Sequence, residues 1–469
     1  MTQLSPTTRS FLNYLIAPAF TTLITMFVVI PVTTFHLEPR DFGVVAILGA
    51  VLAPIGPLSA MGGTWVLGGH YFRLSTGERK ELVFNVLAVD FALRLAWVLV
   101  LGALAPYVLP WVVGDFSPDY ILYFRIMLLS TLLLSLWPTV SYLLVLQKRS
   151  GLHARVELAQ FSVGAIFTII GVAAMGLSVL GLVIGGLAAA LTSFVIAIFC
   201  VAQEAAPHLR RRWLAEVVRL GAPSIPVNLC EIVSSVSDRY FIQKWLDLGQ
   251  LGIYAHSVQY KTGFTLGSKA FARTFSPYAL DAFSGQRSDP RLDRLLKTWF
   301  SLVTAGGVFV CFLAQDLVDL LTHRKFSAAA PLVPIWFLFI ASFAFGGPYA
   351  QFMLASQRSR LVAALNVAIG LASIVLTGIA VYLWGILGAA LSLLLGNIML
   401  QLATRFYALR NGCTRLGDKY FAMCILTICC AYAVAFYGGL GLWPRLAIAA
   451  GTAAIIAVAT DLVRLVRQI

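Results

Sequence analysis

The segment RLGAPSIPVNLCEIVSSVSDRYFIQKWLDLGQLGIYAHSVQYK, which runs from Arg219 to Lys261, decides the fold of this chain. It is apolar enough to lie in a membrane, yet it contains Glu231, Asp238, Arg239 and Lys261. A charged side chain at the centre of a bilayer costs at least about 2.5–3.5 kcal/mol, so such residues face a protein interior or a wet cavity. The segment therefore predicts two membrane helices that line a polar cavity.

The polar residues of this segment fall on one side of each predicted helix. At about 100° per residue, the polar residues Asn228, Ser234, Ser235 and Asp238 lie within about 60° of Glu231. On the next helix, Tyr254, Ser257, Thr265 and Ser268 lie within about 40° of Lys261, and Lys269 lies about 80° away. The alternative interpretation is two buried helices whose polar groups only satisfy one another.

The composition of the whole chain agrees with a membrane protein. Its 469 residues are 59% hydrophobic and only 12% charged, and the mean hydropathy is +0.87. A soluble domain has roughly 25% charged residues. The net charge of +14 does not indicate nucleic-acid binding, because the basic residues form no run longer than Arg210-Arg211-Arg212. We therefore expect a polytopic all-α membrane protein.

Apolar segments long enough to span a bilayer, about 20 residues each, predict fourteen helices. Their ranges are 11–34, 43–69, 83–112, 120–146, 156–176, 178–202, 219–243, 251–276, 297–321, 329–354, 361–383, 385–408, 418–438 and 442–463. The first is too long for a signal peptide, so it reads as a retained helix. With both termini in the cytoplasm, 22 Lys and Arg residues fall in inside loops and 5 in outside loops, which favours this topology.

The connections between these helices are short, and none could house a soluble catalytic domain. The seven cysteines contain no CxxC pair and the six histidines show no metal-ligand spacing. We therefore expect a transporter rather than an enzyme, with no cofactor and no metal site.

The chain also repeats itself weakly. Phe42-Gly43-Val44-Val45-Ala46 matches Leu251-Gly252-Ile253-Tyr254-Ala255 at an offset of 209, and Gln147-Lys148-Arg149-Ser150 matches Gln357-Arg358-Ser359-Arg360 at 210. These matches predict two six-helix lobes in parallel orientation, at 1–205 and 206–412, followed by two further helices at 413–469. Transporters built from parallel repeats bind substrate near the bilayer midplane, between the halves.

Several motifs carry a family resemblance. They are Gly221-Ala222-Pro223, Pro226, Asp238-Arg239, Leu251-Gly252-Ile253-Tyr254-Ala255 and, in the first half, Glu38-Pro39-Arg40-Asp41-Phe42-Gly43. With them the chain resembles the polysaccharide transporter branch, which includes the O-antigen flippases, of the multidrug/oligosaccharidyl-lipid/polysaccharide (MOP) exporter superfamily. The resemblance covers about residues 10–410. It departs at Leu321-Thr322-His323-Arg324-Lys325-Phe326, where the family often has Leu-Thr-Gly.

The resemblance implies a function. It implies a V-shaped flippase of the bacterial inner membrane that moves an undecaprenyl-diphosphate-linked oligosaccharide, a repeat unit of lipopolysaccharide, capsule or exopolysaccharide, to the outer leaflet by alternating access. The implied partners are the lipid-linked oligosaccharide, the bilayer, a polysaccharide polymerase and a chain-length regulator, and no nucleic acid. A proton or sodium gradient would drive transport.

An anionic lipid diphosphate requires a cationic, wet cavity. We expect substrate contacts from Lys261, Arg94, Arg125, Arg239, Lys269, Arg273, Tyr254 and Ser257. Lys261 would hold the diphosphate, and Lys269 and Arg273 would form the cytoplasmic entrance. Candidates for ion coupling are Glu231, Asp238 and Asp90.

Structural interpretations compete with these roles. Asp90 and Arg94 are four residues apart and could only neutralise each other, Asp238-Arg239 could be a structural pair, and Glu231 could pair with Lys261. Arg273 and Arg405 are predicted to snorkel to the cytoplasmic surface.

Two further local features have structural predictions. Residues 208–219 predict an interfacial helix with Trp213 at the lipid boundary. Gly181 and Gly185 predict close helix packing rather than a ligand loop.

Three competing functions remain open to different degrees. A multidrug antiporter of the same superfamily would have a net acidic cavity for cationic drugs, which the basic intramembrane residues disfavour. A peptidoglycan lipid flippase shares the fourteen helices and the cationic cavity. A membrane polysaccharide polymerase or glycosyltransferase is disfavoured because the sequence has no large external loop and no cytosolic nucleotide-sugar domain.

Overall fold

The computed structural model describes residues 16–60, 63–71, 73–221, 225–284, 290–356, 359–439 and 441–459, and within these ranges all regular structure is helical. This confirms the all-α fold class. Ten helical segments in this part of the chain are long and apolar enough to cross a membrane. The protein is therefore a multi-pass membrane protein. The predicted helices 219–243 and 251–276 are not among the ten segments, and the count of fourteen helices and the cytoplasmic location of both termini stay predictions.

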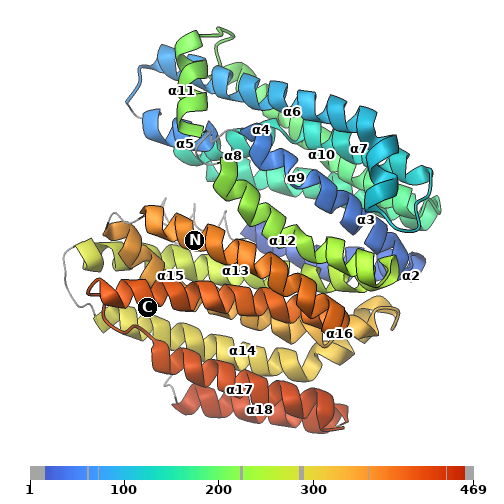
Figure 1. The fold of residues 1–469 in the computed structure, drawn as a ribbon, viewed down its shortest axis with the longest axis vertical. Coiled ribbons are helices and arrows are strands. Elements are labelled where there is room, and N and C mark those ends of the chain that lie inside the picture. Colours follow the sequence, from blue (N-terminus) through green and yellow to red (C-terminus); the bar gives the residue numbers. More distant parts are fainter. Residues whose placement is uncertain are drawn as a thin grey trace, which may run out of the picture. The chain divides into compact units, whose positions relative to one another are not determined.

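The chain forms two compact units, residues 1–252 and 253–469. The helices of the first unit (Figure 1) are η1 (Thr25–Val29), α2 (Ile30–His36), α3 (Pro39–Leu52), α4 (Ile55–Ala60), α5 (Gly63–His70), α6 (Thr76–Val112), α7 (Asp119–Leu133), α8 (Leu136–Leu146), α9 (Ser150–Ile169), η2 (Ile170–Ala174), α10 (Val179–Glu204), α11 (Arg211–Gly221) and α12 (Ile225–Trp245). Helix α13 (Leu248–Ser284) begins in this unit and continues into the second.

Small residues bring α9 and α10 together in the first unit. A Cβ atom built on Gly185 would lie 1.8 Å from Oγ1 of Thr168, and one built on Gly181 would lie 2.8 Å from the carbonyl carbon of Gly171. Only glycine allows the two backbones to approach so closely. The predicted packing role of Gly181 and Gly185 is therefore confirmed.

Helix α12 packs against α3 and α4, so the first compact unit includes it. The unit ends at Gly252, later in the chain than the repeat-based boundary at residue 206. The boundary at residue 206 separates the two copies of the sequence repeat, whereas the boundary at Gly252 separates two compact units. The boundary at residue 206 therefore stays a prediction.

The prediction for Trp213 is wrong. Helix α11 packs against α5 and α6, and Trp213 and Val217 are 3% and 1% exposed in a core that includes Leu67 and Val83. The apolar face of α11 is therefore covered by protein rather than by lipid. Its opposite face carries the exposed Arg212 and remains polar.

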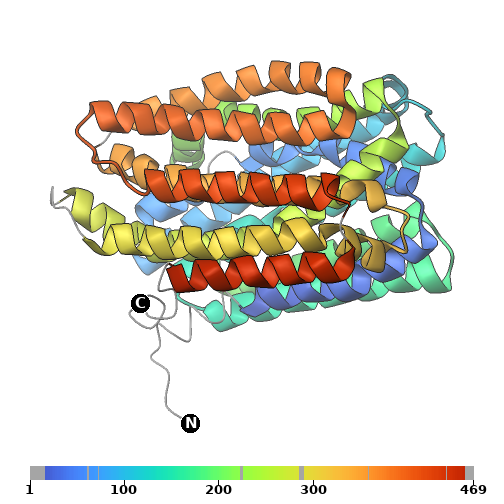
Figure 2. The same ribbon diagram turned by 90° about the horizontal axis from the view of Figure 1, so that it is seen from below.

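The second unit contains the remaining helices. They are α14 (Pro290–Thr322), η4 (Ser327–Ala329), α15 (Leu332–Ala355), α16 (Ser359–Arg410), α17 (Asp418–Tyr437) and α18 (Leu442–Ala459). Helix α16 is interrupted at Gly385, whose φ of 59° and ψ of −140° are not helical, at the place where two separate helices were predicted. Positive φ values are easily reached only by glycine. Helices α17 and α18 both pack against α14 (Figure 2).

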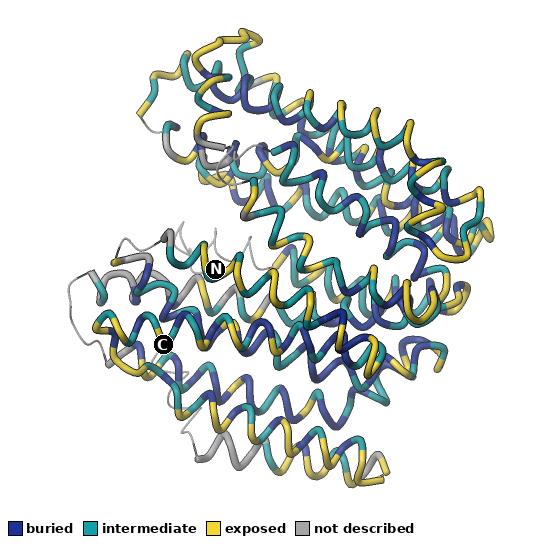
Figure 3. The backbone as a smooth tube through the Cα atoms, viewed as in Figure 1, coloured by how far each residue is buried: buried dark blue, intermediate teal, exposed yellow. Residues whose placement is uncertain are grey.

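Large apolar side chains lie both inside the units and on their surfaces. Phe300, Phe345 and Phe421 belong to the buried core of the second unit, whereas Trp111 is 89% exposed and Tyr382 is 75% exposed. Exposed residues recur along α6 in Figure 3, and many of them are apolar. Soluble proteins rarely expose so much contiguous apolar surface, but a bilayer covers it.

Candidate functional site

One face of α13 in the second unit carries polar and small residues at helical spacing. Lys261, Thr265, Ser268 and Ala272 follow one another at intervals of three or four residues, so their side chains share this face. Lys261 is half-buried, and Ala272 is exposed. The residues that the sequence predicted to share a face with Lys261 therefore lie in one continuous helix.

Aromatic rings of α15 surround the ammonium group of Lys261. Its Nζ atom lies 3.8 Å from the ring centroid of Phe339 and 5.0 Å from that of Trp336. A cation over an aromatic face is attracted by the negative charge of that face, typically by about 0.5–2 kcal/mol. This attraction stabilises the charged form of a lysine in apolar surroundings.

Tyr254 and Ser257 hold Trp336 in place. The indole Nε1 of Trp336 donates a hydrogen bond of 2.9 Å to Oγ of Ser257, and the ring of Tyr254 packs edge-on against the indole at 5.6 Å between centroids. All three side chains are fully buried. The structure thus places Tyr254 and Ser257 behind the aromatic ring that contacts Lys261, and their predicted contact with substrate stays a prediction.

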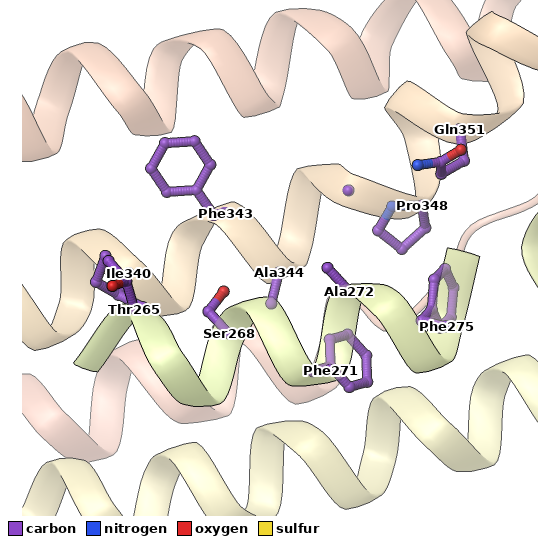
Figure 4. A pocket seen from close by; sticks show the side chains of 11 residues that line it. Thr265, Ser268, Phe271, Ala272, Phe275, Ile340, Phe343, Ala344, Pro348 and Gln351 are labelled. Carbon is purple, nitrogen blue, oxygen red and sulfur yellow. The ribbon is translucent and has the colours of Figure 1, made fainter. Parts of the chain in front are cut away.

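A pocket of about 400 Å³ opens between α13 and α15 one helical turn after Lys261. Thr265, Ser268 and Phe271 line it from α13, and Phe343 and Gly347 are among the residues that line it from α15 (Figure 4). Pockets of roughly 300–1,000 Å³ accept small molecules or parts of larger ones. Lys261 and this pocket, named here the α13/α15 site, form the candidate functional site.

The predicted pair in the first unit is a buried network. Arg94 donates from Nη2 to Asp90 Oδ1 at 3.3 Å, from Nε to Ser59 Oγ at 3.0 Å and from Nη1 to the carbonyl oxygen of Thr131 at 3.3 Å. Asp90 and Arg94 are 2% and 6% exposed. The network joins α4, α6 and α7, so these two residues contribute to the packing of the first unit, while their roles in binding and coupling stay predictions.

The other predicted residues of the first unit lie apart from this network. Arg125 is exposed on α7 and donates to the carbonyl oxygen of Gly102 at 3.3 Å. On α12, Glu231 is exposed, whereas Asp238 is buried and its carboxylate accepts a hydrogen bond of 2.7 Å from the backbone N–H of Arg239. The roles of these residues in binding and coupling, and the Glu231–Lys261 pairing, stay predictions.

For two predicted residues of the cytoplasmic entrance, the structure describes only the backbone. Helix α13 includes Lys269 and Arg273, but their side chains lie outside the described residues.

Among the residues that are described, no three His, Cys, Asp or Glu side chains gather as a metal site would require.

Arg405 pairs with the carboxylate of Asp418 at the start of α17, and its predicted snorkelling to the cytoplasmic surface stays a prediction. Its Nε lies 3.1 Å from both carboxylate oxygens of Asp418, and its Nη2 also contacts this carboxylate. Tyr349 donates to Asp418 at 2.6 Å and accepts from the backbone N–H of Leu416 at 2.9 Å. These bonds connect α15, α16 and the start of α17.

The aromatic side chains of α15 that contact Lys261 were not predicted from the sequence. Trp336, Phe339 and Phe343 follow a spacing of three and four residues, which places them on one side of a helix. That signal was present, but in a segment this apolar it could not be separated from ordinary lipid-facing or core residues. Only the approach of α13 shows which rings meet the cation.

The described residues form an all-helical, multi-pass membrane protein of two compact units, and the second unit holds a lysine against aromatic rings. Solved structures with the same fold include the lipid II flippase MurJ in an inward closed conformation, with a TM-score of 0.73 at 15% identity over 96% of this chain and 97% of that chain. An inward-facing multidrug resistance MATE family transporter of the MOP superfamily has a TM-score of 0.64 at 13% identity over 88% of this chain and 99% of that chain.

A third similar structure is the Vibrio cholerae MATE transporter VcmN, with a TM-score of 0.58 at 13% identity over 87% of this chain and 98% of that chain. No curated protein sequence matches the chain. The family model described as polysaccharide biosynthesis protein matches residues 36–331. The chain belongs to this family.

Proposed function

We propose that the protein is a flippase for a lipid-linked oligosaccharide. Its cargo is a bacterial undecaprenyl-diphosphate-linked repeat unit of lipopolysaccharide, capsule or exopolysaccharide, and alternating access carries it across the inner membrane. The observation that carries the proposal is Lys261, whose ammonium group lies against Phe339 and Trp336, one helical turn before the first residue of α13 that lines an apolar pocket. A lysine there gives a diphosphate an opposite charge, where a bare anion costs several kcal/mol.

Family membership supports the same cargo. The family is described by polysaccharide biosynthesis, and the transporters with this fold include a flippase of lipid II. A peptidoglycan lipid flippase is therefore the nearest alternative, since both cargoes are lipid diphosphates. The lysine in the α13/α15 site disfavours a multidrug antiporter, because a cationic drug would be repelled from Lys261.

Energy coupling and partners complete the proposal. Proton or sodium binding at Glu231, Asp238 or Asp90 would drive the cycle, with Arg94, Arg125, Arg239, Lys269 and Arg273 as further contacts for the anion. A polysaccharide polymerase and a chain-length regulator would use the exported repeat unit. Transport into vesicles that responds to neither a pH nor a sodium gradient would exclude this coupling.

The first experiment removes the gene and analyses the undecaprenyl-linked lipids together with the surface polysaccharide. Accumulation of a lipid-linked oligosaccharide with loss of the surface glycan identifies a flippase and its cargo. An intact glycan with raised sensitivity to cationic drugs would replace this function by multidrug export.

Complementation then tests the site itself. Lys261→Ala should fail to restore the glycan at low expression, and Lys261→Arg should restore part of it. Lys419→Ala is the matched control, because Lys419 is also a lysine over an aromatic ring, at 4.8 Å from Tyr420, but it is exposed outside the site. Normal export by Lys261→Ala would show that this lysine does not hold the diphosphate.

A further inference from the structure

The pocket between α13 and α15 is apolar, unlike the charged Lys261 one helical turn before it. Most of its lining atoms are apolar and come from residues such as Phe271, Phe275, Ile340, Phe343 and Pro348. The only polar side chains in its lining, among the described residues, are those of Thr265, Ser268 and Gln351. An apolar pocket with so few polar groups suits a hydrocarbon chain rather than a sugar.

The hydroxyl of Thr265 does not offer its hydrogen to a ligand in the pocket, which also favours a hydrocarbon chain over a sugar. It donates a hydrogen bond of 2.6 Å to the carbonyl oxygen of Thr262, one turn earlier in the same helix. Its donor is therefore already used at the end of the pocket nearest Lys261. A sugar placed there would lose hydrogen bonds to water without regaining them, which costs free energy, whereas a hydrocarbon chain would gain from burial.

The spacing of the two parts fits one amphiphilic molecule. Lys261 precedes Thr265 by four residues, which is about 6 Å along a helix axis. An anionic group held by Lys261 therefore has its ester bond within a few ångströms of the pocket entrance. Charge complementarity at Lys261 and apolar complementarity beyond it select an anion that is esterified to a hydrocarbon chain.

We propose that this pocket binds the isoprenyl units nearest the diphosphate of the carrier lipid, while Lys261 binds the diphosphate. The proposal rests on the flippase function and adds to it the part of the substrate that the pocket recognises. The carrier then has a fixed direction in the site, with its headgroup toward the N-terminal end of α13. In the predicted topology that end is external, so the pocket holds the carrier in the orientation of the outer leaflet.

Binding by the purified full-length protein tests the proposal with two probes, farnesyl diphosphate and inorganic diphosphate. The wild-type protein should bind farnesyl diphosphate at least about tenfold more tightly than inorganic diphosphate, because only the former has isoprenyl units to bury. Lys261→Gln should weaken binding of both probes.

Two substitutions fill the pocket from opposite walls. Ala272→Leu extends an exposed side chain of α13 that lines the pocket, and Gly347→Leu adds one on α15, where a Cβ atom has no other atom within 4 Å. Each should reduce the affinity for farnesyl diphosphate at least about tenfold and leave that for inorganic diphosphate unchanged. The controls are Ala422→Leu on α17 and Gly451→Leu on α18, which are exposed and lie outside the pocket.

The outcomes separate this proposal from the flippase function. Equal affinity of the wild-type protein for both probes, or unchanged farnesyl diphosphate binding in folded Ala272→Leu and Gly347→Leu, would overturn the pocket assignment and leave the flippase function standing. Selective loss in both pocket variants supports the assignment even if the deleted strain retains its glycan, a result that would refute the proposed cargo alone. Thermal unfolding identifies any variant that fails to fold.

Discussion

Gly43 and Gly252 lie backbone to backbone where the first turns of α3 and α13 meet. A Cβ atom on Gly43 would lie 1.9 Å from the carbonyl oxygen of Leu248, and one on Gly252 would lie 1.6 Å from that of Pro39. The contact is reciprocal, because Pro39 and Leu248 are separated by the same 209 residues as Gly43 and Gly252. The two copies of the sequence repeat therefore pack on each other through equivalent positions.

The first prediction concerns how much this glycine contact contributes to the stability of the folded protein. Gly43→Ala and Gly252→Ala place a methyl group against backbone that cannot rotate away, and overpacking of this kind costs about 1–3 kcal/mol or more. Each variant should unfold at a lower temperature than the wild-type protein in detergent. The control is Gly186→Ala in α10, where a Cβ atom meets nothing within 4 Å and alanine should be neutral or slightly stabilising. A wild-type unfolding temperature for Gly252→Ala would contradict the close contact.

A second prediction separates the positioning role of Ser257 from the charge of Lys261. Ser257→Ala removes the acceptor of the Trp336 indole N–H, and an unpaired buried donor costs about 1–3 kcal/mol. This variant should lose stability and weaken transport while it still binds inorganic diphosphate. Ser257→Thr keeps a hydroxyl and is the matched control for transport. If Ser257→Ala retained full stability, the hydrogen bond would not hold the ring.

The sequence predicted the helical class, the membrane location and the family, because each depends on long apolar segments and short motifs that are local in the chain. Helical periodicity alone also groups Lys261 with Thr265 and Ser268 on one face of α13. The role of Trp336 could not be predicted in this way. It depends on how α15 approaches α13, and no local pattern records such an approach.

Trp213 shows the same limit. It has the sequence pattern of a residue at a membrane surface, an amphipathic aromatic in a basic helix. Its partners Leu67 and Val83 are distant in the chain, so no local pattern records that they bury it.

A third prediction concerns pH. Burial raises the pKa of the Cys413 thiol, in the connection between α16 and α17, to about 11. Because the thiolate is the reactive form, alkylation of a variant that retains Cys413 alone should accelerate about tenfold per pH unit between pH 7 and 9. In denaturant, where the thiol pKa is near 8.5, the rate should be far higher at pH 8 and should level off by about pH 9.5. A plateau below pH 9 in the folded protein would contradict a buried thiol.

The last prediction asks whether Asp90 and Arg94 serve structure or transport. Arg94→Ala leaves the buried Asp90 without its cation, and breaking a buried pair costs about 3–5 kcal/mol. The double variant Asp90→Asn with Arg94→Gln keeps polar groups for Ser59 and removes both charges, so it should regain most of the lost stability.

Transport by that double variant decides between the two roles. If Asp90 and Arg94 only join α4, α6 and α7, the double variant should export glycan nearly as well as the wild-type protein once its stability is restored. If Asp90 carries the coupling ion or Arg94 the substrate, the double variant should be stable but inactive. A stable, inactive double variant would therefore return both residues to the transport pathway, because the charge itself and not the packing would be what export requires.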